Sequence, residues 1–340
     1  MNRMNHYGRV TWRLYCLLLS SWLVSGFVVA QPADYQVPRT VDGVPDFQGM
    51  WTNNTITPLS RPAEFGDKLV LTAEEAFALE QRVAEYTEQQ DQPSDPNREA
   101  PSKGRIELAD SYNNFWFDDG TKVARYNGEF RSSLIVDPPN GQIPDYTPAA
   151  EERIRLAREE REARGAFFGP ESRPLAERCL LSFSSSGGPP MLPILYNNNY
   201  QIVQSPGYVM ILVEMVHDAR IIRIDDDPLP GSHKRWLGDS IGHWEGDTLV
   251  VETSNFNPSQ RFRNASDNYR ITERFTRVSD EVINYRFTIH DPDTFVQDWS
   301  AEIPMNRSSD RLYEYACHEG NYSLPGVLAG ARLDEVESGN

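Results

Sequence analysis

The sequence has 340 residues, enough for one large domain or two ordinary ones with a sizeable hydrophobic core. It contains 50 acidic and 33 basic residues and carries a formal net charge of −17. This balance argues against nucleic acid and anionic membranes as partners, because both recruit proteins through basic residues. With 24% charged, 39% hydrophobic and 11% aromatic residues, the composition is that of a folded globular protein.

The N-terminus predicts a secretory signal peptide over residues 1–30. Three arginines precede an apolar run over residues 14–29, and Ala30 ends a small-residue pattern that signal peptidase cleaves. An uncleaved membrane anchor is the alternative, since the run approaches the minimum length that spans a bilayer. Cys16 lies within the run rather than at its end, which argues against a lipoprotein. No later segment is apolar enough to cross a membrane, so we expect a periplasmic or secreted protein.

Two cysteines, Cys179 and Cys317, follow the predicted signal. In an oxidising compartment we expect them to form a disulfide, which would stabilise the fold by about 4–5 kcal/mol through the entropy of the unfolded chain. The alternative is a pair of buried free thiols that pack as small apolar side chains. A catalytic cysteine is disfavoured, because exported thiols tend to be oxidised.

Residues 31–120, rich in Pro, Asn, Asp and Gln, predict an extended segment that wraps around the rest of the protein. Within it, Thr72 begins a capping box followed by an Ala/Leu/Glu run, which predicts a helix to about Gln90. Residues 91–103 predict a loop. Residues 148–164 predict a second helix, whose Glu/Arg pairs and few apolar residues place it on the surface. Residues 333–340 are expected to form a disordered tail.

Beyond Tyr200 the hydrophobic period changes to two, and turn residues separate short β-rich runs. The predicted strands cover residues 200–204, 208–216, 219–225, 248–256, 270–277, 282–290, 295–304 and 311–317, with earlier candidates at 122–126 and 132–136. Sequential strands joined by hairpins form an antiparallel meander, and a sheet of this length closes or curls to remove its edges. We therefore predict a mainly-β domain over residues 121–332 that closes into a barrel, with the N-terminal segment and two surface helices around it.

Alternation assigns side chains to the two faces of each strand, and carboxylates recur on faces with apolar residues. Glu214, Glu252 and Glu273 each share a face with apolar neighbours and are predicted to point into the barrel. Burial raises the pKa of a carboxyl and a neighbouring arginine lowers it, so these glutamates are candidates for proton transfer. The alternative is structural ion pairing. The available partners are Arg220, Arg223, Arg274 and Arg286.

Two histidines have acidic neighbours. His217 and Asp218 occupy a predicted tight turn, where the carboxylate would orient the imidazole as a general base; ordinary hairpin chemistry is the alternative. His318 and Glu319 follow Cys317, so the expected disulfide would hold them beside a cavity. The alternative is that the disulfide only fastens the C-terminal segment to the rest of the fold. Zinc or iron would suit these four side chains, but they lack a metal-binding spacing and no metal is predicted.

The motif Gly-x-Trp occurs twice, ending at Trp51 and at Trp244. It resembles the motif that opens a lipocalin-type barrel, where the indole closes one end. Residues 45–332 also resemble a group of uncharacterised exported bacterial proteins. The shared stretches are Glu-Met-Val-His-Asp-Ala-Arg-Ile-Ile, Trp-Leu-Gly-Asp-Ser-x-Gly-x-Trp-Glu-Gly-Asp-Thr-Leu-Val-Val-Glu-Thr-x-Asn-Phe, Glu-Arg-Phe and Glu-Tyr-Ala-Cys-His-Glu-Gly-Asn. These resemblances imply export and a lipocalin-like barrel, and they imply no particular reaction.

We expect an enzyme that uses acid–base residues in a barrel cavity for elimination, isomerisation, hydration or cyclisation of a small, partly apolar substrate. No Gly-rich phosphate loop, G-x-S-x-G elbow or H-E-x-x-H motif is predicted, so neither a cofactor nor hydrolase or zincin chemistry is expected. The catalytic candidates are His217, Asp218, Glu214, Glu273 and Glu319, and the substrate-binding candidates are Trp51, Arg220, Trp244, Glu252, Trp299 and His318.

Two other functions stay open. A periplasmic carrier or binding protein would hold an apolar ligand in the same cavity. A structural module would dock through residues 148–164 and would have a filled barrel and an exposed apolar patch. Convergence of His217 and the inward carboxylates on one cavity would favour catalysis, whereas pairing of the carboxylates with arginines would favour binding. The oligomeric state is left open.

Overall fold

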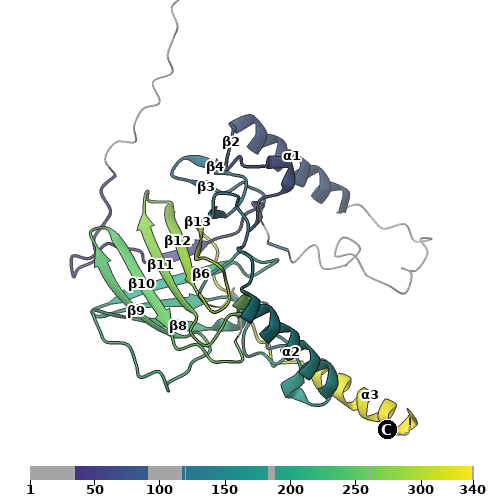
Figure 1. Cartoon of the computed structure of the whole chain (residues 1–340). Coiled ribbons are helices and arrows are strands. Elements are labelled where there is room, and N and C mark those ends of the chain that lie inside the picture. The colour runs from purple at the N-terminus through teal and green to yellow at the C-terminus, as the bar shows by residue number, and fades with distance from the viewer. Residues whose placement is uncertain (1–34, 91–116, 119, 183–187, 261, 339–340) are drawn as a thin grey trace, which may run out of the picture. The chain divides into compact units, whose positions relative to one another are not determined.

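The computed structural model describes residues 35–90, 117–118, 120–182, 188–260 and 262–338 (Figure 1). The predicted signal peptide of residues 1–30 and the predicted loop of residues 91–103 lie outside this range. Within it, no helix combines the length and the apolar character that a membrane span requires.

Nine strands of the described chain close into a barrel, which confirms the predicted mainly-β fold. In order of pairing they are β1 (Gly49–Thr52), β6 (Asn199–Ser205), β7 (Tyr208–Val213), β8 (Ala219–Ile224), β9 (Asp239–Glu245), β10 (Thr248–Ser254), β11 (Arg270–Arg277), β12 (Val282–His290) and β13 (Trp299–Arg307). Strand β1 closes the ring, because Trp51 lies opposite both Tyr200 of β6 and Arg307 of β13. A further strand, β5 (Ile135–Asp137), pairs with β13.

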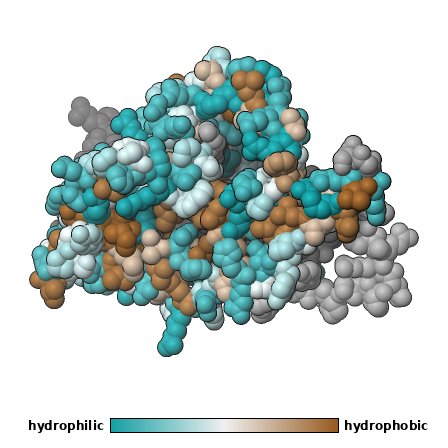
Figure 2. Space-filling view, turned by 90° about the horizontal axis from the view of Figure 1, so that it is seen from below, coloured by the Kyte–Doolittle hydropathy of each residue, from teal (hydrophilic) through white to brown (hydrophobic). Residues whose placement is uncertain are grey.

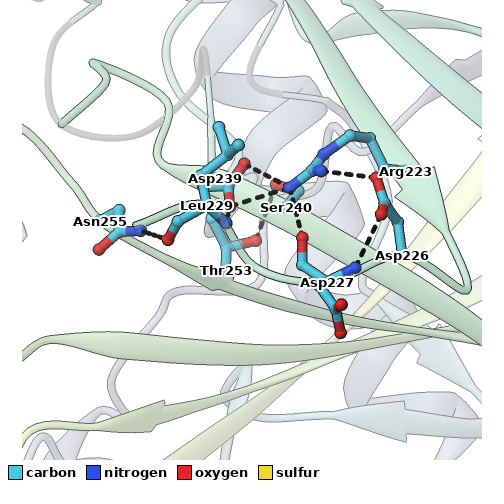
Figure 3. A network of polar contacts seen from close by, with 8 residues as sticks. All are labelled: Arg223, Asp226, Asp227, Leu229, Asp239, Ser240, Thr253 and Asn255. Carbon is cyan, nitrogen blue, oxygen red and sulfur yellow. Dashed lines mark hydrogen bonds and ion pairs between the residues drawn. The ribbon is translucent and has the colours of Figure 1, made fainter. Parts of the chain in front are cut away.

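One pair departs from the predicted antiparallel meander, because β8 and β9 run parallel. Parallel neighbours need a long crossover, which residues 225–238 supply. Arg223 fastens this crossover: its guanidinium donates to Asp226 at 2.6 Å and to both carboxylate oxygens of Asp239 at 3.2 Å (Figure 3). Asp239 also accepts from the backbone N–H of Leu229 at 2.8 Å. A short hairpin would have made the pair antiparallel, and the Arg223 contacts hold the longer connection instead.

The alternating patterns located most strands. Strands β11 and β12 have the predicted bounds, and β6, β7, β8 and β10 differ by a few residues at their ends. The predicted strand at residues 311–317 is wrong, because β1 already occupies the free edge of β13 and leaves no ladder position for it. Strands β1 and β9 were not predicted, although a Gly-x-Trp motif lies in each of them.

Both predicted helices form. In α1 (Ala73–Gln90) the predicted capping box is present: the N–H of Glu75 donates to the Thr72 hydroxyl at 3.2 Å, and the N–H of Thr72 donates to the Glu75 carboxylate at 2.8 Å. In α2 (Pro148–Arg164) the Thr147 hydroxyl caps the N-terminus. A third helix, α3 (Ser323–Ser338), covers most of residues 333–340, so the predicted disordered tail is helical as far as Ser338.

Shorter elements complete the described fold. A small sheet contains β2 (Val70–Leu71), β4 (Glu129–Arg131) and β3 (Arg125–Tyr126) in that order. It packs against α1 through a cluster of Leu71, Ala76 and Val123. The single-turn 3₁₀ helices are Ala63–Phe65, Pro170–Ser172, Met215–His217 and Phe262–Asn264.

Large side chains fill the barrel interior. Along β11 and β12 every second residue is buried, which is the pattern of strands with one face inward. The inward side chains with at most 1% exposure include Trp51, Tyr200, Val251, Glu273, Phe275, Tyr285, Phe287 and Trp299. The interior is therefore a packed core.

Candidate functional site

Glu273 points into the barrel as predicted, and its charge is fully paired. Its side chain has no exposed surface, and both carboxylate oxygens accept hydrogen bonds from the Arg220 guanidinium. The Tyr285 hydroxyl donates to the same carboxylate at 2.8 Å. Burial raises the pKa of Tyr285 well above its usual value, so the hydroxyl keeps the proton that it donates. Glu273 and Arg220 thus form a structural ion pair inside the barrel.

The rest of the Arg220 guanidinium is also satisfied. It donates to the hydroxyl of Ser240 at 3.0 Å and to that of Thr253 at 2.9 Å. Ser240 is the serine of a G-x-S-x-G stretch at residues 238–242, so the expectation that this sequence pattern is absent is wrong. A nucleophile elbow requires a sharp turn from strand to helix, whereas Ser240 lies within β9 with its hydroxyl buried in this network. The stretch is therefore not an elbow.

Trp51 lies in β1, the strand that joins β6 and β13. Its indole N–H donates to the carbonyl of Phe47 at 2.9 Å, and the guanidinium carbons of Arg277 and Arg307 lie 5.7 and 5.5 Å from the ring centroid. These cation–π contacts and the complete burial of the ring make Trp51 a packing residue.

The other two predicted tryptophans also pack against aromatic rings. Trp244 is half-buried, with its ring centroid 5.5 Å from that of Phe47. Trp299 is completely buried, and its ring packs against those of Phe287 and Phe295. Neither indole lines a cavity with the predicted acid–base residues.

His217 and Asp218 adjoin in the turn between β7 and β8 but do not form the predicted pair. The imidazole Nδ1 of His217 lies 2.8 Å from the carbonyl oxygen of Tyr315, so Nδ1 carries the proton and this carbonyl orients the ring. Burial raises the pKa of Asp218 to about 6, against a smaller lowering by the charge of His217. Its Oδ2 is buried and has no hydrogen-bond partner in the described structure.

Glu214 lies at the end of β7 and lines a cavity of about 680 Å³. Its buried carboxylate accepts from the side-chain amide of Asn199 and from the backbone N–H of Tyr313, each at 2.9 Å. The other charged residues of this cavity are Asp118, Asp310 and Glu314, and its aromatic residues are Phe117, Tyr196 and Tyr313. His217 and Asp218 are not among the lining residues, so the predicted acid–base set does not converge at this cavity.

Glu252 faces outward, so its predicted inward position is wrong. The inward residues of β10 are Leu249, Val251 and Thr253, and Glu252 lies opposite Thr272 on the outer face. It lines a hollow of about 520 Å³ together with His290, which sequence reasoning missed. His290 bridges the carboxylate of Asp298 at 2.7 Å and the hydroxyl of Thr272 at 3.2 Å. No local pattern marks this contact, because Thr272 lies in β11, His290 lies in β12 and Asp298 lies just before β13.

The predicted disulfide between Cys179 and Cys317 is confirmed, with Cα atoms 5.7 Å apart. It joins the segment after α2 to the segment after β13. His318 and Glu319 follow it in an exposed turn, and their side chains face solvent. In the part of the chain that the structure describes, no group of three or more His, Cys, Asp and Glu side chains is placed to hold a metal ion.

The largest of these cavities, about 840 Å³, lies beside α1, and sequence reasoning missed it. We call it the α1 groove. It is lined by Thr55, Ile56, Thr57, Pro58, Leu59, Val83, Tyr86, Leu134, Leu192, Pro193, Ile194, Leu195, Tyr196 and Arg263. Arg263 is the single charged residue among them. A signal was present in the sequence, because Leu79, Val83 and Tyr86 recur at helical spacing on one face of α1.

Apolar side chains are exposed at other places too. They include Phe168 after α2 and Leu333 and Val336 in α3. On the face shown in Figure 2, hydrophobic residues form patches between hydrophilic ones. The filled barrel and these patches are the features expected of a structural module. The expected carrier would hold its ligand inside the barrel, whereas the α1 groove lies beside α1.

Comparison with protein-family models, curated proteins and solved structures finds no match for this chain. The resemblance to exported bacterial proteins therefore stays a prediction. Any function has to be inferred from the residues of the site.

Proposed function

We propose that the protein is an exported binding or carrier protein that holds a small, largely apolar ligand in the α1 groove. The observation that carries this proposal is a cavity of about 840 Å³ with one charged lining residue. Ligand sites are typically concave, mostly apolar and about 300–1,000 Å³ in volume. Removing apolar ligand surface from water supplies the binding free energy, at roughly 25 cal/mol per Å².

The state of the predicted catalytic residues supports binding over catalysis. Glu273 is neutralised by Arg220, and Glu214 lines a cavity that His217 and Asp218 do not reach. Acid–base chemistry needs a donor and an acceptor within hydrogen-bond reach of one substrate atom. In the described structure the predicted catalytic residues do not line one common cavity, so the expected elimination, isomerisation, hydration or cyclisation activity stays a prediction.

The test is calorimetric titration of the mature protein with 1-decanol, an uncharged apolar probe. We expect saturable binding with one molecule per chain. Leu195→Glu adds a charge at an exposed position of the α1 groove and should weaken binding at least about tenfold, because the charge must be desolvated when the ligand enters. Val296→Glu is the matched control, since Val296 is exposed and lies outside the groove. Absence of saturable binding, or equal weakening in both variants, contradicts the proposal.

A further inference from the structure

A second cavity, of about 640 Å³, lies between α2 and residues 174–182, 259–260 and 262–264. We call it the α2 cavity. Its lining includes three arginines, Arg153, Arg161 and Arg263. The one carboxylate that lines it, Glu160, is already paired with Arg164 at 2.6 Å. The cavity therefore has a local excess of positive charge in a chain whose net charge is −17.

Among the residues that the structure describes, no acidic side chain neutralises the three arginines. Arg153 donates only to uncharged oxygens: the carbonyls of Asp293 and Asn264 and the hydroxyl of Thr294. Within the described residues, no ion pair involves Arg153, Arg161 or Arg263. Most other arginines near the barrel are paired with acids, as Arg220 is with Glu273. Unpaired guanidinium groups around one cavity favour an anionic occupant, since they bind carboxylate and phosphate through directed hydrogen bonds.

A buried amide oxygen on the wall of the same cavity also lacks a partner in the described structure. Gln260 lines the α2 cavity and is only 7% exposed, yet its side-chain oxygen has no hydrogen-bond partner in the described structure. Buried polar side chains are nearly always hydrogen-bonded, so an unused amide on a cavity wall is a place for a polar ligand group. The two ends of the amide exchange by a half rotation, so it can serve an acceptor or a donor.

Arg263 connects this cavity to the proposed ligand site, because it lines both the α2 cavity and the α1 groove. Its backbone is left-handed, with φ of 52°, and the next residue, Asn264, has φ of 61°. For an arginine this conformation costs on the order of 1 kcal/mol or more, and such residues cluster at functional sites. The position of Arg263 makes the two cavities adjacent parts of one site.

We infer that the α2 cavity is a head-group subsite for an anionic group, a carboxylate or phosphate, of the ligand whose apolar part lies in the α1 groove. This inference rests on the proposed function. The ligand class is then an anionic amphiphile. The arginines select the charged end, and the apolar lining of the groove holds the chain.

The test compares three probes with the same alkyl chain, namely 1-decanol, decanoate and decyl phosphate, by calorimetric titration at low salt. We expect decanoate or decyl phosphate to bind at least about tenfold more tightly than decanol, and this preference should shrink in high salt because partly exposed charges are screened. The double variant Arg161→Gln/Arg263→Gln should lower the ratio of anion to alcohol affinity to nearly one. Both side chains are exposed, so the variant is expected to fold.

The matched control is Arg158→Gln, which removes the same charge from α2 at a position that does not line the cavity. It should preserve the ratio of affinities. Equal affinity for all three probes, or an equal loss of preference in the control, overturns the head-group subsite and leaves the proposed function intact. Failure of every probe to bind overturns both. Which anion binds more tightly decides between a carboxylate and a phosphate head group.

Discussion

At the scale of single residues, Arg220 and Glu273 show how charges are accommodated inside the barrel. Both side chains are nearly inaccessible to solvent, and each hydrogen-bonds with the other and with neighbouring hydroxyls. A buried pair of this kind contributes little net stability, because desolvation offsets the attraction, but one partner alone is strongly unfavourable. The pairing is therefore required by the fold once either charge is present.

Glu273→Gln should lower the free energy of unfolding by about 3 kcal/mol, because it leaves the Arg220 charge buried without a counter-ion. Equilibrium urea unfolding measures the change. The control is Glu252→Gln, which changes an exposed glutamate on the neighbouring strand and should stay within about 0.5 kcal/mol of the wild type. A loss below about 1 kcal/mol in Glu273→Gln would show that the pair is not what keeps Arg220 in the interior.

The raised pKa of Asp218 predicts that the stability of the fold depends on pH. Its pKa is raised to about 6 by burial, so the folded state holds this proton more tightly than the unfolded state, and stability falls as the pH rises from about 4 to about 6. Asp218→Asn should match the wild type near pH 4 and exceed its stability by about 1 kcal/mol at pH 7, after allowance for the exposed part of the carboxyl. Urea unfolding across this range measures the difference. A difference that does not change with pH refutes the assignment.

At the scale of elements, α1 depends on a local cap and on a small cluster of apolar contacts. The capping box of Thr72 and Glu75 satisfies two backbone N–H donors at the N-terminus. The helix packs on the small sheet through the cluster that contains Ala76. Since α1 also forms a wall of the α1 groove, its local stability bears on ligand binding.

Thr72→Ala should destabilise α1 by about 1 kcal/mol, because the N-terminal amides lose the hydroxyl that caps them. Hydrogen exchange of the α1 amides should become roughly fivefold faster if the helix opens locally. Thr72→Ser keeps the hydroxyl and serves as the control. Unchanged exchange in Thr72→Ala would mean that tertiary contacts alone hold the start of the helix.

At the scale of the whole molecule, two long-range links join distant parts of the chain. Strand β1 pairs with β6 and with β13, which closes the ring of strands. The disulfide joins Cys179 to Cys317 across 138 residues. Both links restrict the unfolded or partly opened chain more than any local contact does.

Replacing both cysteines by serine should lower the free energy of unfolding by about 5 kcal/mol, the value that the chain-entropy model gives for a loop of 138 residues. Denaturant unfolding of the variant measures this loss, and the wild type unfolded with a reducing agent present should show the same shift. If the cysteine variant and the reduced wild type both lose less than about 1 kcal/mol of unfolding free energy, other contacts already hold together the segments that the disulfide joins.

The sequence alone determined the local parts of this structure. The bounds of β11 and β12 and the start of α1 follow from alternation and from a capping box, which act over a few neighbouring residues. The pairing of Cys179 with Cys317 was predicted by count, because the third cysteine, Cys16, lies in the predicted signal peptide. The inward position of Glu273 also follows from alternation, and the list of possible arginine partners contained the right one, Arg220.

The tertiary structure decided the rest, because it depends on contacts between residues far apart in the chain. The run of apolar residues in β10 fits either face, so only pairing with β9 and β11 placed Glu252 outside. The parallel pairing of β8 and β9 depends on where the crossover between them folds back. The closure of the barrel depends on the pairing of β1 with β13, which lies far away in the sequence. The α1 groove and the α2 cavity meet at Arg263 by the packing of separate segments, which no periodicity in the sequence encodes.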